Sequence, residues 1–99
     1  MILAVLFLAT APLGDLSGYP EIAKYGPLPQ DVRVLIDRRM QCDHWTGEEP
    51  YDRARRRQID TAIRQLRCDT VEREEKRLER RYSNVPAVLK ALTETRDWQ

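Results

Sequence analysis

The sequence predicts an all-α fold: a small helical hairpin or bundle of three to four helices behind an extended, disordered N-terminal segment. Three observations support this. Apolar residues recur at helical spacing from residue 30 onward, no useful stretch alternates as a β-strand does, and residues 12–30 are rich in proline and glycine. With 99 residues, 41% hydrophobic and 33% charged, the chain forms one domain with a small core. Its formal net charge of +1 supplies no strong overall field for nucleic acid or an anionic membrane.

The chain begins with an uncharged apolar run at residues 2–11. Its length matches the hydrophobic region of a signal peptide and is too short to span a bilayer. No Lys or Arg precedes the run, and the best small-x-small site, at Ala9 and Ala11, is followed by Pro12. We therefore expect a signal peptide within residues 1–18 and leave its cleavage site open. A retained N-terminal anchor and a plain buried or disordered start are the alternatives.

Residues 19–29 are predicted to be a linker. They contain three prolines and one glycine, which favour turns and extended backbone over regular helix. We expect this segment to be extended and mobile, with the helical domain occupying residues 30–99.

The first helix is predicted over residues 30–41. Val32, Leu35, Ile36 and Met40 recur at i, i+3, i+4 and i+8, which is the spacing of one buried helical face. Charged residues fall on the opposite side of the same helix, so this segment is expected to pack one face against the core.

After a break at residues 42–50, residues 51–82 are strongly helix-forming, but their apolar stripe changes face. One side carries Ile59, Ala62, Ile63 and Leu66, and another carries Cys68, Val71, Leu78 and Tyr82. At about 100° per residue the two sides lie more than a right angle apart. A single helix could bury two faces, or it could break near Asp69, where Asp69 and Glu72 have the spacing of a capping box. Nothing in residues 67–70 forbids helix, so we favour a continuous helix with a kink.

A last, short helix is predicted from Pro86 to about Asp97. Proline is favoured in the first turn of a helix, where its missing N–H is no loss. Val88, Leu89 and Leu92 supply the apolar face that this helix would bury.

The two cysteines, Cys42 and Cys68, are expected to form an intramolecular disulfide, because small exported domains commonly compensate for a limited core in this way. The expected geometry is demanding, since Cys68 lies about 25 Å along the second helix at ~1.5 Å per residue. Residues 43–50 would have to run back along that helix and lay Trp45 against it. An intermolecular disulfide and free buried thiols are the alternatives.

A more specific alternative is a metal-binding module that uses Cys42, His44 and Cys68. Zinc sites usually present paired short spacings such as C-x2-C with four evident ligands, and this sequence has neither, so we expect no metal and no cofactor. His44 is the only histidine, and adjacent residues rarely aim their side chains at one another as a catalytic triad requires. No phosphate loop, G-x-S-x-G or dinucleotide fingerprint occurs, so the sequence predicts that the protein is not an enzyme.

A group of arginines near the start of the second helical segment is the candidate partner-binding site. It consists of Arg53, Arg55, Arg56 and Arg57, followed by Arg64 and Arg67. These side chains could bind an unknown protein partner or another acidic ligand, or they could form a solvated, salt-bridged surface. Nucleic acid is not an expected partner, because the charge of the chain is balanced and export would separate the protein from nucleic acid. Membrane contact is expected only through a retained N-terminal segment.

The spacing of Cys68, Leu78 and Tyr82 resembles that of small exported helical proteins of the N-terminal family of bacterial lysozyme inhibitors. In that family two cysteines pair, a later helix carries an L-x-x-x-Y pattern, and members are periplasmic or membrane-associated. The likeness covers residues 68–82; the family's asparagine after the leucine is Glu79 here, and the cysteines stand further apart. The resemblance implies export and a disulfide, whereas no residue of this chain points to lysozyme inhibition.

Together these features favour a small exported helical binding or envelope-accessory protein, periplasmic or secreted, with one disulfide and no catalytic activity. A cytosolic regulatory or scaffold helix-bundle protein with buried free cysteines is the alternative. The two differ in compartment and in the state of the thiols.

Overall fold

The computed structural model describes residues 13–98, which contain helices and turns and no β-strand, so the all-α prediction is confirmed. The four α-helices are α1 Gln30–Thr46, α2 Arg53–Gln65, α3 Val71–Arg81 and α4 Pro86–Glu94. Three short 3-10 helices also occur: Pro20–Tyr25 before α1, Cys68–Thr70 between α2 and α3, and Thr95–Asp97 after α4.

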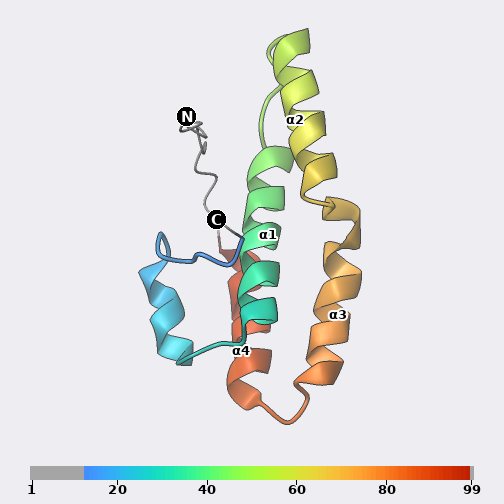
Figure 1. The fold of residues 1–99 in the computed structure, drawn as a ribbon. Coiled ribbons are helices and arrows are strands. Elements are labelled where there is room, and N and C mark those ends of the chain that lie inside the picture. Colours follow the sequence, from blue (N-terminus) through green and yellow to red (C-terminus); the bar gives the residue numbers. More distant parts are fainter. Residues whose placement is uncertain (1–12, 99) are drawn as a thin grey trace, which may run out of the picture.

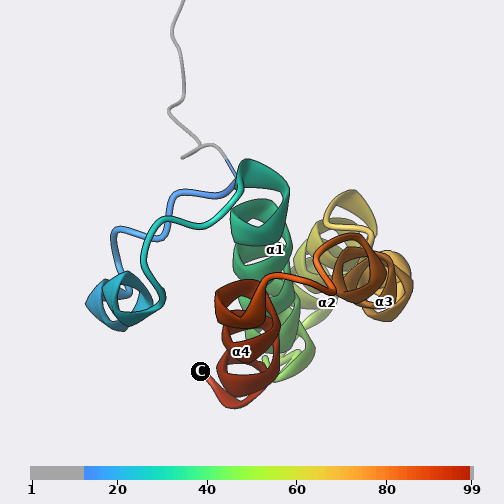
Figure 2. The ribbon, with the colours of Figure 1, turned by 90° about the horizontal axis from the view of Figure 1, so that it is seen from below.

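The helix α1 lies at the centre of the bundle, with α3 and α4 packed against it (Figure 1). Seen along the helices, the Pro20–Tyr25 turn and α3 lie on opposite sides of α1 and α4 (Figure 2). The helix α2 extends beyond the C-terminal end of α1, so the rest of the bundle covers it least. Within the described part of the chain, no helix is both long enough and apolar enough to cross a membrane.

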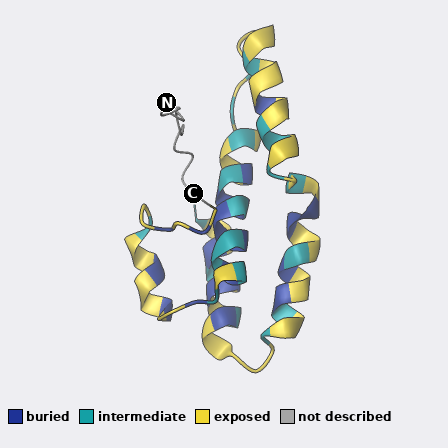
Figure 3. Cartoon of the chain, viewed as in Figure 1, coloured by how far each residue is buried: buried dark blue, intermediate teal, exposed yellow. Residues whose placement is uncertain are grey.

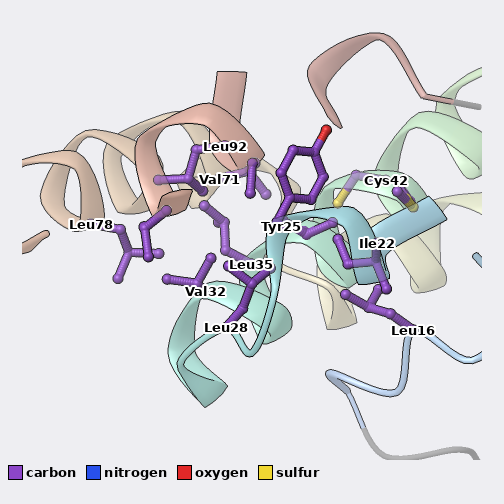
Figure 4. Packing of buried hydrophobic residues seen from close by; sticks show 14 residues of the cluster. Leu16, Ile22, Tyr25, Leu28, Val32, Leu35, Cys42, Val71, Leu78 and Leu92 are labelled. Atoms are coloured by element: carbon purple, nitrogen blue, oxygen red, sulfur yellow. The ribbon is translucent and has the colours of Figure 1, made fainter. Parts of the chain in front are cut away.

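The core is built on one face of α1, as predicted: Val32, Leu35, Ile36 and Met40 are all buried. The side chains that α3 and α4 contribute to the same cluster are Val71, Leu78, Val88, Ala91 and Leu92 (Figure 4). Leu89, which was predicted to be buried, is only half-buried. The inward face of α4 instead follows Val88, Ala91 and Leu92 at the i, i+3, i+4 spacing of a helix.

Residues 19–29 differ from the predicted extended linker, because they pack against the bundle. Ile22, Tyr25 and Leu28 are buried in the main cluster, and the Pro20–Tyr25 turn packs against α4. Ile22 and Tyr25 stand three positions apart, which brings them to the same side of the 3-10 turn, and Leu28 follows in the segment that leads to α1. The packed domain therefore begins before residue 30.

Contacts further upstream also belong to the fold. Leu16, which falls within the expected signal peptide, is 1% exposed. The Gly14 N–H donates to the Asp37 carboxylate at 2.9 Å, and the Gly14 carbonyl accepts from Arg33 Nε at 3.2 Å. Gly14 has φ +99°, a left-handed conformation that favours glycine. The apolar run at residues 2–11 lies outside the described residues.

The helix α1 continues five residues beyond its predicted end at Gln41, so Cys42 lies inside the helix. The Cys42 side chain is buried and extends the apolar face of α1 by one more position. The helix stops at Gly47, whose N–H donates to the Asp43 carbonyl at 3.1 Å. The Thr46 hydroxyl donates to the Cys42 carbonyl at 2.9 Å in the last turn.

The prediction of one continuous helix over residues 51–82 is wrong. Between α2 and α3, Arg67 has φ 53° and ψ 50°, a left-handed conformation that is uncommon for a residue other than glycine. The Arg67 carbonyl accepts hydrogen bonds from Arg38 Nη2 at 3.3 Å and from the Thr70 hydroxyl at 2.8 Å. The capping box suggested at Asp69 is not formed, since Thr70 precedes α3 without a side-chain cap. The change of apolar face therefore marks a break between two helices.

Candidate functional site

The predicted disulfide is present, with the Cys42 and Cys68 sulfur atoms 2.16 Å apart and the Cα atoms 5.7 Å apart. Cys42 comes from α1 and Cys68 from the turn between α2 and α3, so the bond fastens the helix break to the central helix. Closing a loop with a sequence separation of 26 stabilises the fold by about 3–4 kcal/mol in the chain-entropy model.

The chain between the first cysteine and α2 runs beside α2, as the predicted disulfide required. It remains helical as far as Thr46 and then passes along α2 to reach the start of that helix (Figure 1). The Arg55 guanidinium carbon lies 5.2 Å from the centre of the Trp45 ring. A hollow of about 370 Å³ is lined by Trp45 together with Arg57, Gln58, Thr61, Ala62 and Gln65. The expected packing of Trp45 on the second helix is confirmed.

The four candidate partner-binding arginines do not form one uniform group. The Asp52 carboxylate caps α2 by accepting from the Arg55 N–H at 2.7 Å, so the arginines occupy the first turns of the helix. The Arg55 side chain folds back and pairs with Glu48 at 3.1 Å, which makes it part of the contact between α2 and the preceding loop. The other three are exposed and form no ion pair with any described residue: Arg53, Arg56 and Arg57.

Arg64 is exposed on the same side of α2 as Arg53 and Arg57. At about 100° per residue, Arg53, Arg57 and Arg64 fall within about 40° of one another, with Arg56 at the edge of the group. We call these four residues the arginine face. Six arginines and one acidic residue occupy positions 53–67, whereas the rest of the chain holds eleven basic and fifteen acidic residues. The arginine face is therefore the cationic part of an otherwise acidic molecule.

A buried ion cluster, which the sequence did not reveal, joins α1, α3 and the C-terminal turn. Arg39 and Glu75 are 6% and 7% exposed, and their charged atoms meet at 3.2 Å. Arg39 also donates to the Leu92 carbonyl at 3.2 Å and to the Thr95 hydroxyl, while Arg96 bonds Glu75 from the other side. Burial lowers the pKa of Arg39 and Glu75 opposes that shift, whereas the hydrogen bond to Glu75 raises the pKa of Arg96. Arg39 and Glu75 form the buried pair of this cluster, whereas Arg96 is exposed and pairs with Glu75 from the C-terminal turn.

Two tyrosine hydroxyls make further contacts between segments that are distant in sequence. The Tyr25 hydroxyl donates to Glu94 at 2.7 Å, and the Tyr82 hydroxyl donates to Asp31 at 2.8 Å. Burial and the bond to Glu94 raise the pKa of Tyr25 to about 12. The bond to Asp31 is the main cause of the raised pKa of Tyr82. Both phenols therefore keep their protons at neutral pH and serve as hydrogen-bond donors.

Cys42, His44 and Cys68, which the sequence offered as a possible metal site, are engaged in other contacts. His44 lies beside a cavity of about 550 Å³, with its side chain 62% exposed and its Nε2 3.2 Å from a Glu48 carboxylate oxygen. Cys42 is bonded to Cys68 and so offers no thiolate to His44. Among residues 13–98 no three His, Cys, Asp or Glu side chains gather in a way that could hold a metal ion. The alternative site at Cys42, His44 and Cys68 is therefore not formed.

Comparisons of the chain with protein-family models, with curated proteins and with solved structures gave no match. The resemblance of residues 68–82 to the lysozyme-inhibitor family stays a prediction.

Proposed function

We propose that the protein is a small exported helical binding or envelope-accessory protein, held by one disulfide and without catalytic activity. The Cys42–Cys68 bond carries this proposal, because disulfides persist in oxidising compartments and are common where a small domain has a limited core. The apolar run at residues 2–11 supports export independently. The compartment that we propose is the periplasm or the extracellular space.

The contacts of Gly14 and Leu16 bear on where a signal peptide can be removed. Both residues belong to the packed domain, so cleavage at residue 18 would take away part of the core. The small-x-small pattern at Ala9 and Ala11 lies upstream of these contacts. We therefore place cleavage at this upstream site, with a retained anchor as the alternative.

A binding role is proposed because the reactive groups already have partners within the protein, whereas a charged surface remains free. Cys42 is oxidised, and His44 pairs with Glu48. The arginine face has no such partner among residues 13–98. Leu78 and Tyr82, which carry the lysozyme-inhibitor resemblance, contact the protein's own core and Asp31, so they support no inhibitor function.

Intact-mass spectrometry of the protein from its native host tests the proposal. We expect a chain that has lost an N-terminal segment upstream of Leu13 and that gains two hydrogen atoms on reduction. A chain that keeps Met1 and whose two thiols react with an alkylating reagent in unbroken cells would refute export and favour the cytosolic scaffold. The variant Cys42→Ser/Cys68→Ser provides the control for the mass change on reduction.

A further inference from the structure

We propose that the arginine face and the adjoining hollow at Trp45 together bind an acidic polypeptide segment of a partner protein. This inference rests on the proposed binding function and names its surface and its partner class. Carboxylate side chains of the partner would pair with the guanidinium groups, and one neighbouring side chain would enter the hollow.

The arginine face is accessible because the bundle covers little of α2. Ile59 is the only fully buried residue of this helix, and most of its surface is exposed (Figure 3). On α3, by contrast, glutamates alternate with the basic residues and pair with them, as Glu72 does with Lys76 and Glu74 with Arg77. The positive charge of α2 is thus left for another molecule to neutralise.

The sign of the charge identifies the partner as anionic. Positions 53–67 hold six arginines and one acidic residue, Asp60, which lies among the arginines on the same helix face and forms no ion pair within the described structure. Arginine presents a planar fork of donors that matches a carboxylate in a bidentate manner. Arg53, Arg57 and Arg64 project such forks along about 16 Å of one helix face. A row of carboxylates along an extended chain can meet several of them together.

The hollow beside this row favours a polypeptide over a lipid surface. Its volume is about 370 Å³, and Arg57 belongs both to the hollow and to the arginine face. Trp45 supplies an aromatic wall, while Gln58, Thr61 and Gln65 supply amide and hydroxyl groups for a peptide backbone. A layer of lipid headgroups offers negative charge but no side chain to fill such a space.

The test uses the full oxidised protein and two probes: poly-L-glutamate and a random copolymer of glutamate and tyrosine. Titration calorimetry should show binding to both, and tighter binding to the copolymer. The variant Arg53→Gln/Arg57→Gln/Arg64→Gln should weaken binding by about tenfold to a hundredfold, because three exposed charge pairs are removed. The variant Thr61→Phe fills the hollow, so it should weaken binding of the copolymer more than binding of poly-L-glutamate and remove the preference for the copolymer.

A matched control removes the same number of charges elsewhere. Arg73, Arg80 and Lys90 are exposed and unpaired among residues 13–98, and they lie on α3 and α4. The variant Arg73→Gln/Arg80→Gln/Lys90→Gln should weaken binding by less than about threefold, since only long-range attraction is reduced. Circular dichroism and a non-reducing mass measurement confirm that each variant is folded and oxidised.

Three outcomes would overturn the proposal. Equal losses of affinity in the two triple variants would show that binding follows net charge alone. Binding to phosphatidylglycerol vesicles as tight as to the copolymer, and abolished in the α2 variant, would assign the face to a lipid surface. If the protein bound neither polymer, the arginine face would not be a site for acidic polypeptides. Export is tested separately, because an uncleaved chain with free thiols in its host would refute it without changing any of these binding results.

Discussion

The negative charge of Glu75 is expected to be costly to remove, because it neutralises a buried cation. Glu75 meets Arg39 at 3.2 Å inside the bundle, and both residues are less than 10% exposed. The substitution Glu75→Gln keeps the shape of the side chain and one oxygen acceptor, but it leaves the positive charge of Arg39 without the carboxylate that neutralises it. Breaking a buried ion pair at one partner costs roughly 3–5 kcal/mol. The amide oxygen retained by Gln places the expected loss at the lower end, about 3 kcal/mol.

Urea denaturation followed by circular dichroism measures this loss as a change in midpoint. With a slope of about 1.5 kcal/mol per M urea, the midpoint should fall by about 2 M. Glu72→Gln is the matched control, because Glu72 lies on the same helix and pairs with Lys76 at 3.4 Å in an exposed setting. It should lower the free energy of unfolding by about 0.5 kcal/mol or less.

Equal midpoint shifts for Glu75→Gln and Glu72→Gln would refute the reasoning, since burial would then make no difference. A second variant, Arg39→Met/Glu75→Leu, removes both buried charges together. It should be more stable than Glu75→Gln, because the unpaired charge is the main source of the destabilisation. A double variant as unstable as Glu75→Gln would instead assign the destabilisation to packing.

The disulfide, the N-terminal segment and the Tyr25 hydroxyl give three more expected outcomes. Cys42→Ser/Cys68→Ser should lower the free energy of unfolding by about 3.5 kcal/mol, seen as a lower urea midpoint that reductant no longer changes; an unaltered midpoint would contradict the loop-closure argument. Deleting residues 1–18 should lower the thermal midpoint below that of a chain that lacks residues 1–12 alone, and equal midpoints would show that Gly14 and Leu16 add nothing to the stability of the fold. Because the pKa of Tyr25 is raised from 10.0 to about 12, the stability that its proton provides is complete below pH 10 and disappears as the pH rises towards 12. Tyr25→Phe should remove this fall in unfolding free energy, and a curve of unchanged slope would exclude Tyr25 as its source.

The apolar period predicted which face of α1 is buried, but it did not predict where the helix ends. Val32, Leu35, Ile36 and Met40 lie on one side of a helix of any length, so their burial follows from spacing alone. Cys42 continues that face. Because Cys42 was interpreted only as a disulfide partner, the helix was predicted to end before it. The same spacing argument applied to Ile22 and Tyr25 would have found the packed N-terminal turn, had the prolines and the glycine not suggested a linker.

The left-handed conformation of Arg67 at the helix break and the pairing of Arg39 with Glu75 could not be predicted from local sequence. Arg67 is not a residue that favours left-handed backbone, which costs about 1–2 kcal/mol for an L-residue. That cost is offset by hydrogen bonds to its carbonyl, one of them from Arg38 in α1. Arg39 and Glu75 likewise come from different helices and meet only after the chain has folded. Both features depend on packing between helices, which the spacing within one helix does not determine.

The way in which α2 is attached links the disulfide to the arginine face. At its beginning the helix is held by Arg55, which contacts Glu48 and the Trp45 ring. Just beyond its end, the bond from Cys68 to Cys42 fixes the turn to α1. Because both attachments lie on the inward side, the outward arginines keep a fixed spacing without being covered. Reduction removes one of the two attachments, so the arginine face is fully supported only where the disulfide can form. The disulfide is therefore expected to support the proposed binding surface as well as the stability of the fold.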